Sequence, residues 1–113
     1  MKAVLIKNAN IVNEGKIVKG DVLVQDGRIA EISETISAKS SDTKVIDADG
    51  SYLMPGMIDD QVHFREPGLT HKATIETESK AAVAGGITSF IEMPNTVPQA
   101  ITIELLEEKF KIA

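Results

Sequence analysis

Short apolar runs separated by polar turns make up the first half of the chain, residues 1–54. Residues 21–24 and 28–32 are two such runs, and each is too short for a helix. The Asp26-Gly27 pair between them supplies the positive φ angles that a tight hairpin turn needs. Strand-like alternation resumes over residues 44–47. This pattern predicts a small antiparallel β domain over residues 1–54.

The pattern changes from residue 55 onward, where segments of helical character separate the apolar runs. Residues 57–64 and 87–93 have the composition of strands. Between them, residues 73–84 are rich in helix formers and are followed by two glycines, which suit a helix C-terminus. Apolar residues at helical spacing predict a second helix from about Thr102. The order strand, helix, strand, helix is typical of the start of a parallel α/β sheet.

Two parallel strands do not complete such a fold, because a closed (β/α)₈ barrel takes roughly 250 residues. We therefore expect the chain to be the front of a longer protein. The predicted fold class is α/β. Residues 55–113 would form the first two β/α units of a TIM-type (β/α)₈ barrel, and residues 1–54 would be the N-terminal β domain that contributes to a composite β-sandwich.

Composition and charge exclude several classes of function. The 113 residues include no cysteine, which excludes disulfide scaffolds and thiolate metal sites. The net charge of −5 offers no basic surface for phosphates, so we expect no nucleic-acid partner. The apolar run near the N-terminus is far too short for a signal peptide or a membrane span. We expect a cytoplasmic protein that does not bind membranes.

A row of polar side chains gives the clearest indication of chemistry. Asp59, Gln61, His63 and Arg65 alternate along the first predicted strand of the second half, so a strand would place them on one face. Such a row is costly inside a barrel unless it meets a metal, a ligand or a partner charge. Parallel barrels carry their active sites at the C-terminal ends of their strands. The row therefore predicts a functional site where this strand ends.

Two motifs make the indication more specific. Residues 63–68 read HFREPG and residues 93–96 read MPNT, with Ala84-Gly85-Gly86 between them. With these motifs the chain resembles dihydroorotase, a family of the amidohydrolase superfamily. The resemblance implies a TIM-barrel hydrolase that opens a cyclic amide, dihydroorotate, to N-carbamoyl-aspartate in pyrimidine biosynthesis. That substrate is a small molecule.

The same resemblance implies roles for individual residues. His63 matches the second histidine of a pair that binds zinc, one or two ions, and it also lies beside the substrate. Arg65 and Asn95 match residues that hold the substrate carboxylate. Gln61 stands where the family has the first histidine, and its amide oxygen is a weak zinc ligand compared with imidazole. Whether Gln61 binds metal stays open at this point.

The remaining family ligands and the general base are expected beyond Ala113. We therefore expect no catalytic residue within this chain and no activity from it alone. Gln61 also suits a non-catalytic dihydroorotase-like subunit that supports an aspartate transcarbamoylase partner. A third alternative is a related hydantoinase, dihydropyrimidinase or allantoinase, against which Arg65 argues because a buried guanidinium needs an anion. A homo-oligomer also stays open.

Two other residues have simpler interpretations. His71 lies in a polar stretch before a predicted helix, where a solvent-exposed histidine is expected. Glu92 lies in the second strand of this half, and we expect it to form a salt bridge with a lysine.

Overall fold

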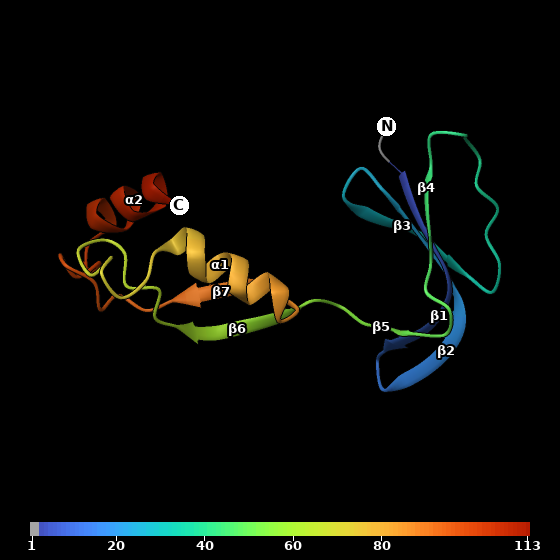
Figure 1. Ribbon diagram of the computed structural model, residues 1–113, viewed down its shortest axis with the longest axis horizontal. Coiled ribbons are helices and arrows are strands. Elements are labelled where there is room, and N and C mark those ends of the chain that lie inside the picture. The colour runs from blue at the N-terminus through green and yellow to red at the C-terminus, as the bar shows by residue number, and fades with distance from the viewer. Residues whose placement is uncertain (1–2) are drawn as a thin grey trace. The chain divides into compact units, whose positions relative to one another are not determined.

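A computed structural model describes residues 3–113, which divide into two compact units between Pro55 and Gly56 (Figure 1). None of the helices in the described residues has the length and apolar character needed to cross a membrane.

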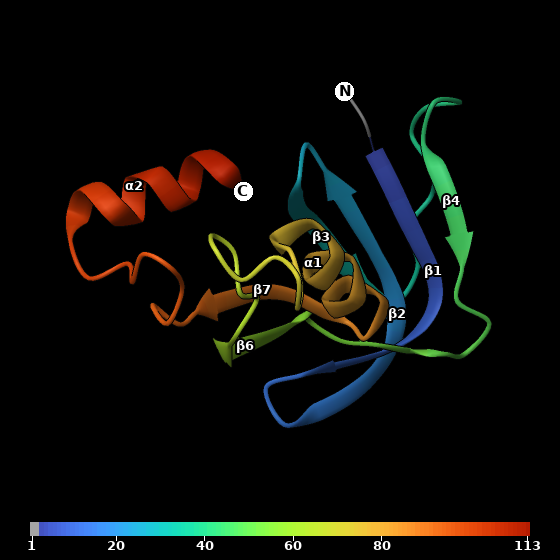
Figure 2. The same ribbon diagram turned by 60° about the vertical axis from the view of Figure 1, so that its left-hand side comes forward.

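The first unit is a five-stranded sheet. Its strands are β1 (Ala3–Asn13), β2 (Lys16–Gln25), β3 (Arg28–Ser33), β4 (Lys44–Asp47) and β5 (Tyr52–Leu53). The order across the sheet is β3-β2-β1-β4, and β5 also pairs with β1. The first three strands form an antiparallel meander, visible in Figure 2.

The turn between β2 and β3 confirms the predicted hairpin. Asp26 has a φ of 51° and Gly27 a φ of 75°, and Gln25 pairs with Arg28 directly across the turn. Positive φ at both central residues is the geometry of a type I′ turn, whose twist matches that of the flanking strands. The local sequence therefore accounts for the geometry of this turn.

The prediction of an antiparallel first domain is confirmed for β1, β2 and β3 and is wrong for β4 and β5. Strands β4 and β5 both run parallel to β1, with Leu5 opposite Val45 and Ile11 opposite Leu53. Two-residue turns join antiparallel neighbours, whereas a parallel neighbour needs a longer connection. The connection over residues 34–43 is long enough to return the chain to the other edge of β1. The sheet is consequently mixed.

The core of the first unit is small and aliphatic. Ala9, Ile11 and Val22 are buried, and partly buried aliphatic side chains pack around them. Beside this core Asp21 is only 2% exposed, and its two carboxylate oxygens accept hydrogen bonds from the backbone amides of Asn8 and Ile36, both at 2.9 Å. These bonds, first that from Ile36 and then that from Asn8, lower the pKa of Asp21.

The second unit contains two β/α pairs. Its elements are β6 (Met57–Val62), α1 (Ile75–Ala84), β7 (Ile87–Glu92) and α2 (Ile103–Ile112). Strands β6 and β7 pair in parallel, which confirms the predicted strand–helix–strand–helix order. Among the described residues these two strands form an open two-stranded sheet, and they do not form a barrel.

The bounds of β6 and α1 differ from the sequence prediction, and β7 ends at Glu92, one residue before its predicted end. Strand β6 ends at Val62 rather than at residue 64. Three residues later Arg65 adopts a left-handed conformation with a φ of 70°, which a strand does not tolerate. Helix α1 begins at Ile75, and Thr74 is its N-cap, accepting a hydrogen bond from the Thr77 amide at 3.1 Å. The site residues after Val62 therefore lie on a loop.

Candidate functional site

Two loops meet at the C-terminal ends of the parallel strands. One follows β6 and carries residues 63–74, and the other follows β7 and carries residues 93–102 (Figure 1). The Met93 amide donates to the Val62 carbonyl at 2.9 Å, and the Val97 amide donates to the Pro67 carbonyl at 3.1 Å. These backbone hydrogen bonds join the two motif-bearing loops into one structure.

The structure brings His63 and Asn95 into contact. The Nδ1 atom of His63 lies 3.0 Å from Oδ1 of Asn95, although the two residues are 32 positions apart. An amide oxygen accepts, so Nδ1 carries a proton in this contact, and in the neutral imidazole the lone pair is then on Nε2. Because the His63 side chain is exposed, Nε2 is accessible to a metal ion or a ligand.

The residues around His63 follow the expected alternation of exposed and buried side chains only in part. Gln61 and His63 are exposed, while Val62 and Phe64 are buried. Ile58, which the alternation places on the apolar face, is 70% exposed. The carboxylate of Asp59 accepts a hydrogen bond from the Gln61 backbone amide at 3.0 Å. Asp59 therefore stabilises the backbone at Gln61.

Arg65 lies two residues after His63 on the same loop and is partly buried. Its φ of 70° is uncommon for a residue with a side chain, and such conformations concentrate at functional sites. The Arg65 carbonyl accepts from the Leu69 amide at 3.0 Å, which closes a tight turn. The guanidinium therefore extends from a constrained backbone.

The two loops approach each other closely at Gly68. Its φ is 83°, and a Cβ atom placed there would overlap the carbonyl oxygen of Val97. Next to this contact Thr96 is buried, and its hydroxyl donates to the Pro98 carbonyl at 2.9 Å. Only a glycine allows the two backbones to approach this closely.

Glu66 has a role that the sequence did not indicate. Its Oε2 atom accepts a hydrogen bond from the Ile75 amide at 2.8 Å, at the first residue of α1. A carboxylate at this position also interacts favourably with the positive end of the helix dipole. Glu66 therefore fixes the loop to α1. The sequence did contain one signal for this contact, because Glu66 is an acidic residue a short distance before the start of the predicted helix.

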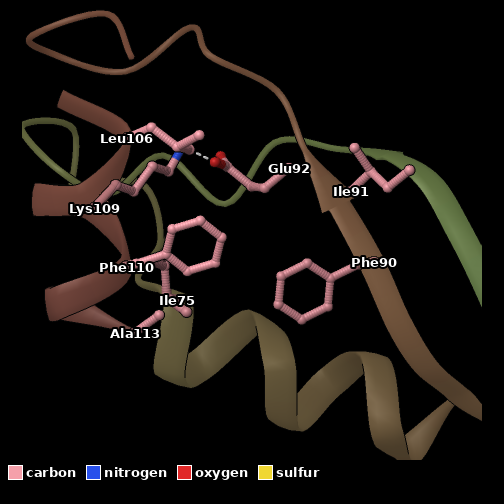
Figure 3. A pocket seen from close by; sticks show the side chains of 8 residues that line it. All are labelled: Ile75, Phe90, Ile91, Glu92, Leu106, Lys109, Phe110 and Ala113. Atoms are coloured by element: carbon pink, nitrogen blue, oxygen red, sulfur yellow. Dashed lines mark ion pairs between the residues drawn. The ribbon is translucent and has the colours of Figure 1, made fainter. Parts of the chain in front are cut away.

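Glu92 forms the predicted salt bridge with a lysine, and its partner is Lys109 of α2 (Figure 3). The other carboxylate oxygen of Glu92 accepts from the Phe64 amide at 3.2 Å. Burial of the Lys109 ammonium lowers its pKa, because loss of hydration disfavours the charged form. The sequence did not indicate a buried Lys109, because a lysine near a helix C-terminus is usually solvated.

The other histidine, His71, is exposed on the loop before α1, as expected. Within residues 3–113, no three histidine, aspartate or glutamate side chains come together as a metal-binding cluster.

Comparison with known sequences identifies relatives of the chain. The sequence profile of the family described as dihydro-orotase-like matches residues 50–111. A dihydroorotase of Carboxydothermus hydrogenoformans is 51% identical over 112 residues, which cover 95% of this chain and 26% of that protein. A dihydroorotase of Bacillus thuringiensis is 49% identical, covering 92% of this chain and 24% of that protein. The chain thus spans about a quarter of the length of these relatives.

Two solved structures also superpose on this chain. An L-hydantoinase (dihydropyrimidinase) from Arthrobacter aurescens superposes with a TM-score of 0.92 and 38% identity, covering 100% of this chain and 25% of that one. A D-hydantoinase (dihydropyrimidinase) from a Thermus species superposes with a TM-score of 0.71 and 41% identity, covering 80% of this chain and 20% of that one.

Proposed function

The chain belongs to the dihydro-orotase-like family, and we propose that it is the front part of a metal-dependent cyclic amidohydrolase that opens dihydroorotate. In this proposal residues 1–54 contribute to a composite β-sandwich, and residues 55–113 begin a TIM-type barrel. The observation that carries the proposal is the contact between His63 and Asn95 at the ends of two parallel strands. That contact joins the two motifs of the family at the edge where barrel enzymes place their active sites.

The donor set of the chain suits one side of a zinc site. The His63 Nε2 atom has an accessible lone pair, because Asn95 accepts the proton on Nδ1. Gln61, two residues earlier on β6, offers an amide oxygen as a weaker ligand. The remaining ligands would come from residues outside this chain. Zinc, when bound, lowers the pKa of a coordinated water and polarises a carbonyl group.

Arg65 and Asn95 are the groups that we propose bind the substrate carboxylate. A guanidinium has a planar array of donors that matches both oxygens of a carboxylate. The Asn95 side chain keeps its NH₂ group free to donate while its oxygen accepts from His63. The two motif loops hold both residues at one end of the sheet.

A hydantoinase-like activity is the second candidate, because the L-hydantoinase of Arthrobacter aurescens matches 100% of the chain with a TM-score of 0.92. Uncharged rings lack the carboxylate that Arg65 would bind. Substrate preference of the full-length protein therefore distinguishes the two candidates.

The test compares kcat/KM for dihydroorotate with kcat/KM for hydantoin and dihydrouracil, in the wild type and in Arg65→Met. We expect the wild type to prefer dihydroorotate. We expect Arg65→Met to lose roughly 10- to 150-fold on dihydroorotate alone, as the loss of a charged hydrogen bond predicts. Arg65→Lys, which keeps the charge without the planar donors, should retain part of the preference. A wild type that prefers the uncharged rings would replace the proposal with the hydantoinase candidate.

No turnover of any ring by the folded, zinc-supplied protein would contradict both candidates. That result would instead support the non-catalytic subunit that Gln61 suggests. Co-purification with an aspartate transcarbamoylase would then be the measurement to make.

A further inference from the structure

An ion pair buried on α2 and β7 contacts the backbones of both loops of the site. The side chains of Glu92 and Lys109 are each only 9% exposed. The Glu92 carboxylate accepts from the amide of Phe64, the residue that follows His63. The Lys109 ammonium donates to the Met93 carbonyl at 3.3 Å, two residues before Asn95. One pair of charges is thus connected to the backbone within one residue of His63 and within two residues of Asn95.

The surroundings of this pair are apolar. Figure 3 shows Lys109 reaching from α2 toward Glu92 across the edge of a cavity of about 320 Å³. The other residues that line this cavity are apolar: Ile75, Phe90, Ile91, Leu106, Phe110 and Ala113.

We propose that Glu92 and Lys109 are positioning residues for the site, which hold His63 and Asn95 in register through the Phe64 amide and the Met93 carbonyl. The inference rests on the proposed function, because it assigns a use to the same two loops. Neither residue is expected to touch the substrate.

Stability alone does not account for the pair. Replacing a buried ion pair by apolar residues of similar size is often neutral or stabilising, because the charges lose their hydration. Here each charged side chain also forms a hydrogen bond with a backbone atom of one loop. A small displacement of reacting groups, of about 1 Å, costs roughly 100-fold in rate. Holding the loops in place is therefore the function that the geometry supports.

The experiment uses the full-length protein with two double variants. Glu92→Leu/Lys109→Met removes both charges together, so neither is left buried without its partner. Glu92→Gln/Lys109→Met keeps an acceptor for the Phe64 amide and the shape of both side chains. Lys111→Met is the matched control, because Lys111 pairs with Glu108 at 2.5 Å on the exposed side of the same helix.

In Glu92→Leu/Lys109→Met we expect kcat/KM for dihydroorotate to fall roughly 10- to 100-fold, with KM rising because Asn95 is displaced. The Glu92→Gln/Lys109→Met variant should lose less, and Lys111→Met should match the wild type. Unchanged kcat and KM in both double variants, with only the thermal midpoint shifted, would overturn the inference. If Glu92→Leu/Lys109→Met fails to fold, the kcat and KM of Glu92→Gln/Lys109→Met decide the question in the same way.

Amide hydrogen exchange separates this inference from the proposed function. We expect faster exchange over residues 63–68 and 93–97 in the double variants and not in Lys111→Met, whether or not the wild type turns over dihydroorotate. Equal exchange in these loops would overturn the positioning role. An inactive wild type with faster loop exchange in the variants would reject the proposed function alone.

Discussion

The amide oxygen of Asn95 defines the state of His63. By accepting from Nδ1 at 3.0 Å, it selects the tautomer with a lone pair on Nε2, which is the form that binds a metal. The opposite end of the same amide is left to donate. One side chain thus orients a proposed metal ligand and contributes a donor for the substrate.

Asn95→Ala is expected to weaken dihydroorotate binding. Loss of a hydrogen bond to a charged group costs about 1.5–3 kcal/mol, so KM should rise roughly 10- to 150-fold. Gln99→Ala, at an exposed position on the same loop, is the control and should leave KM unchanged. Steady-state kinetics measures both, and an unchanged KM in Asn95→Ala would contradict the assigned role.

Asp21 gives a residue-level prediction for the first unit. Its folded-state pKa lies below the ordinary value of 3.8, because the amides of Ile36 and Asn8 hydrogen-bond to the carboxylate. The carboxylate therefore contributes stability above about pH 4, and this contribution is lost as the pH falls through the lowered pKa. Asp21→Asn should lower the melting temperature by several degrees at neutral pH, because an NH₂ group would face a backbone N–H.

The pH dependence of thermal unfolding checks this prediction. Between pH 5 and pH 2 the wild type should lose more stability than Asp21→Asn. The exposed Asp42, replaced by Asn, is the control and should keep the wild-type slope. Equal slopes for the wild type and Asp21→Asn would show that Asp21 is not the group responsible.

At the scale of elements, the site depends on two loops that are joined backbone to backbone. The Val97 amide bonds to the Pro67 carbonyl, and Gly68 leaves no space for a side chain beside Val97. The ends of β6 and β7 place the two loops side by side, and the contacts at Pro67, Gly68 and Val97 fix the distance between the loops. Helix α1 adds a third constraint through Glu66, which binds the amide of Ile75.

Gly68→Ala should therefore be more damaging than an ordinary glycine replacement. The left-handed backbone costs about 1–2 kcal/mol and the overlap with Val97 a further ~1–3 kcal/mol. Gly86→Ala is the matched control, because Gly86 has a φ of 88° but no atom lies within 4 Å of the position that an added methyl group would take. Denaturant unfolding should show a loss of about 1–2 kcal/mol for Gly86→Ala and a larger loss for Gly68→Ala. Equal losses would mean that the loops separate at little cost.

Features that depend on interactions between residues close in the sequence were easier to predict than features that depend on contacts between distant residues. The turn at Asp26-Gly27 depends on local backbone preference, so the sequence was sufficient to predict it. The parallel return of β4 depends on a long connection and leaves no local pattern. The two motifs indicated a shared site for His63 and Asn95, and parallel strand ends bring them together. The burial of Lys109 arises from tertiary packing, which periodicity does not encode.

At the scale of the whole molecule, the second unit carries much apolar surface without a covering layer. Ile58 of β6 is 70% exposed and Ile91 of β7 is 56% exposed. Apolar side chains on the strands of a parallel sheet are normally buried by neighbouring elements. The exposed surface is therefore consistent with the proposal that the chain is part of a larger barrel.

Residues 1–113 alone should consequently self-associate and bind a hydrophobic dye such as ANS. The full-length protein should show less dye fluorescence per mole, because its additional elements would cover these strands. Size-exclusion chromatography and dye titration measure both properties. A monomer of residues 1–113 with sharp, well-dispersed amide spectra and no dye binding would contradict this expectation.

The most direct test follows the consumption of dihydroorotate by its ultraviolet absorbance, with the full-length protein supplied with zinc. His63→Ala and His71→Ala provide a matched comparison, because both histidines are exposed and only His63 contacts Asn95. We expect turnover in the wild type and in His71→Ala, and a loss of roughly 100-fold in His63→Ala, as expected for a disturbed metal site. Full turnover in His63→Ala, or none in the folded wild type, would contradict this expectation.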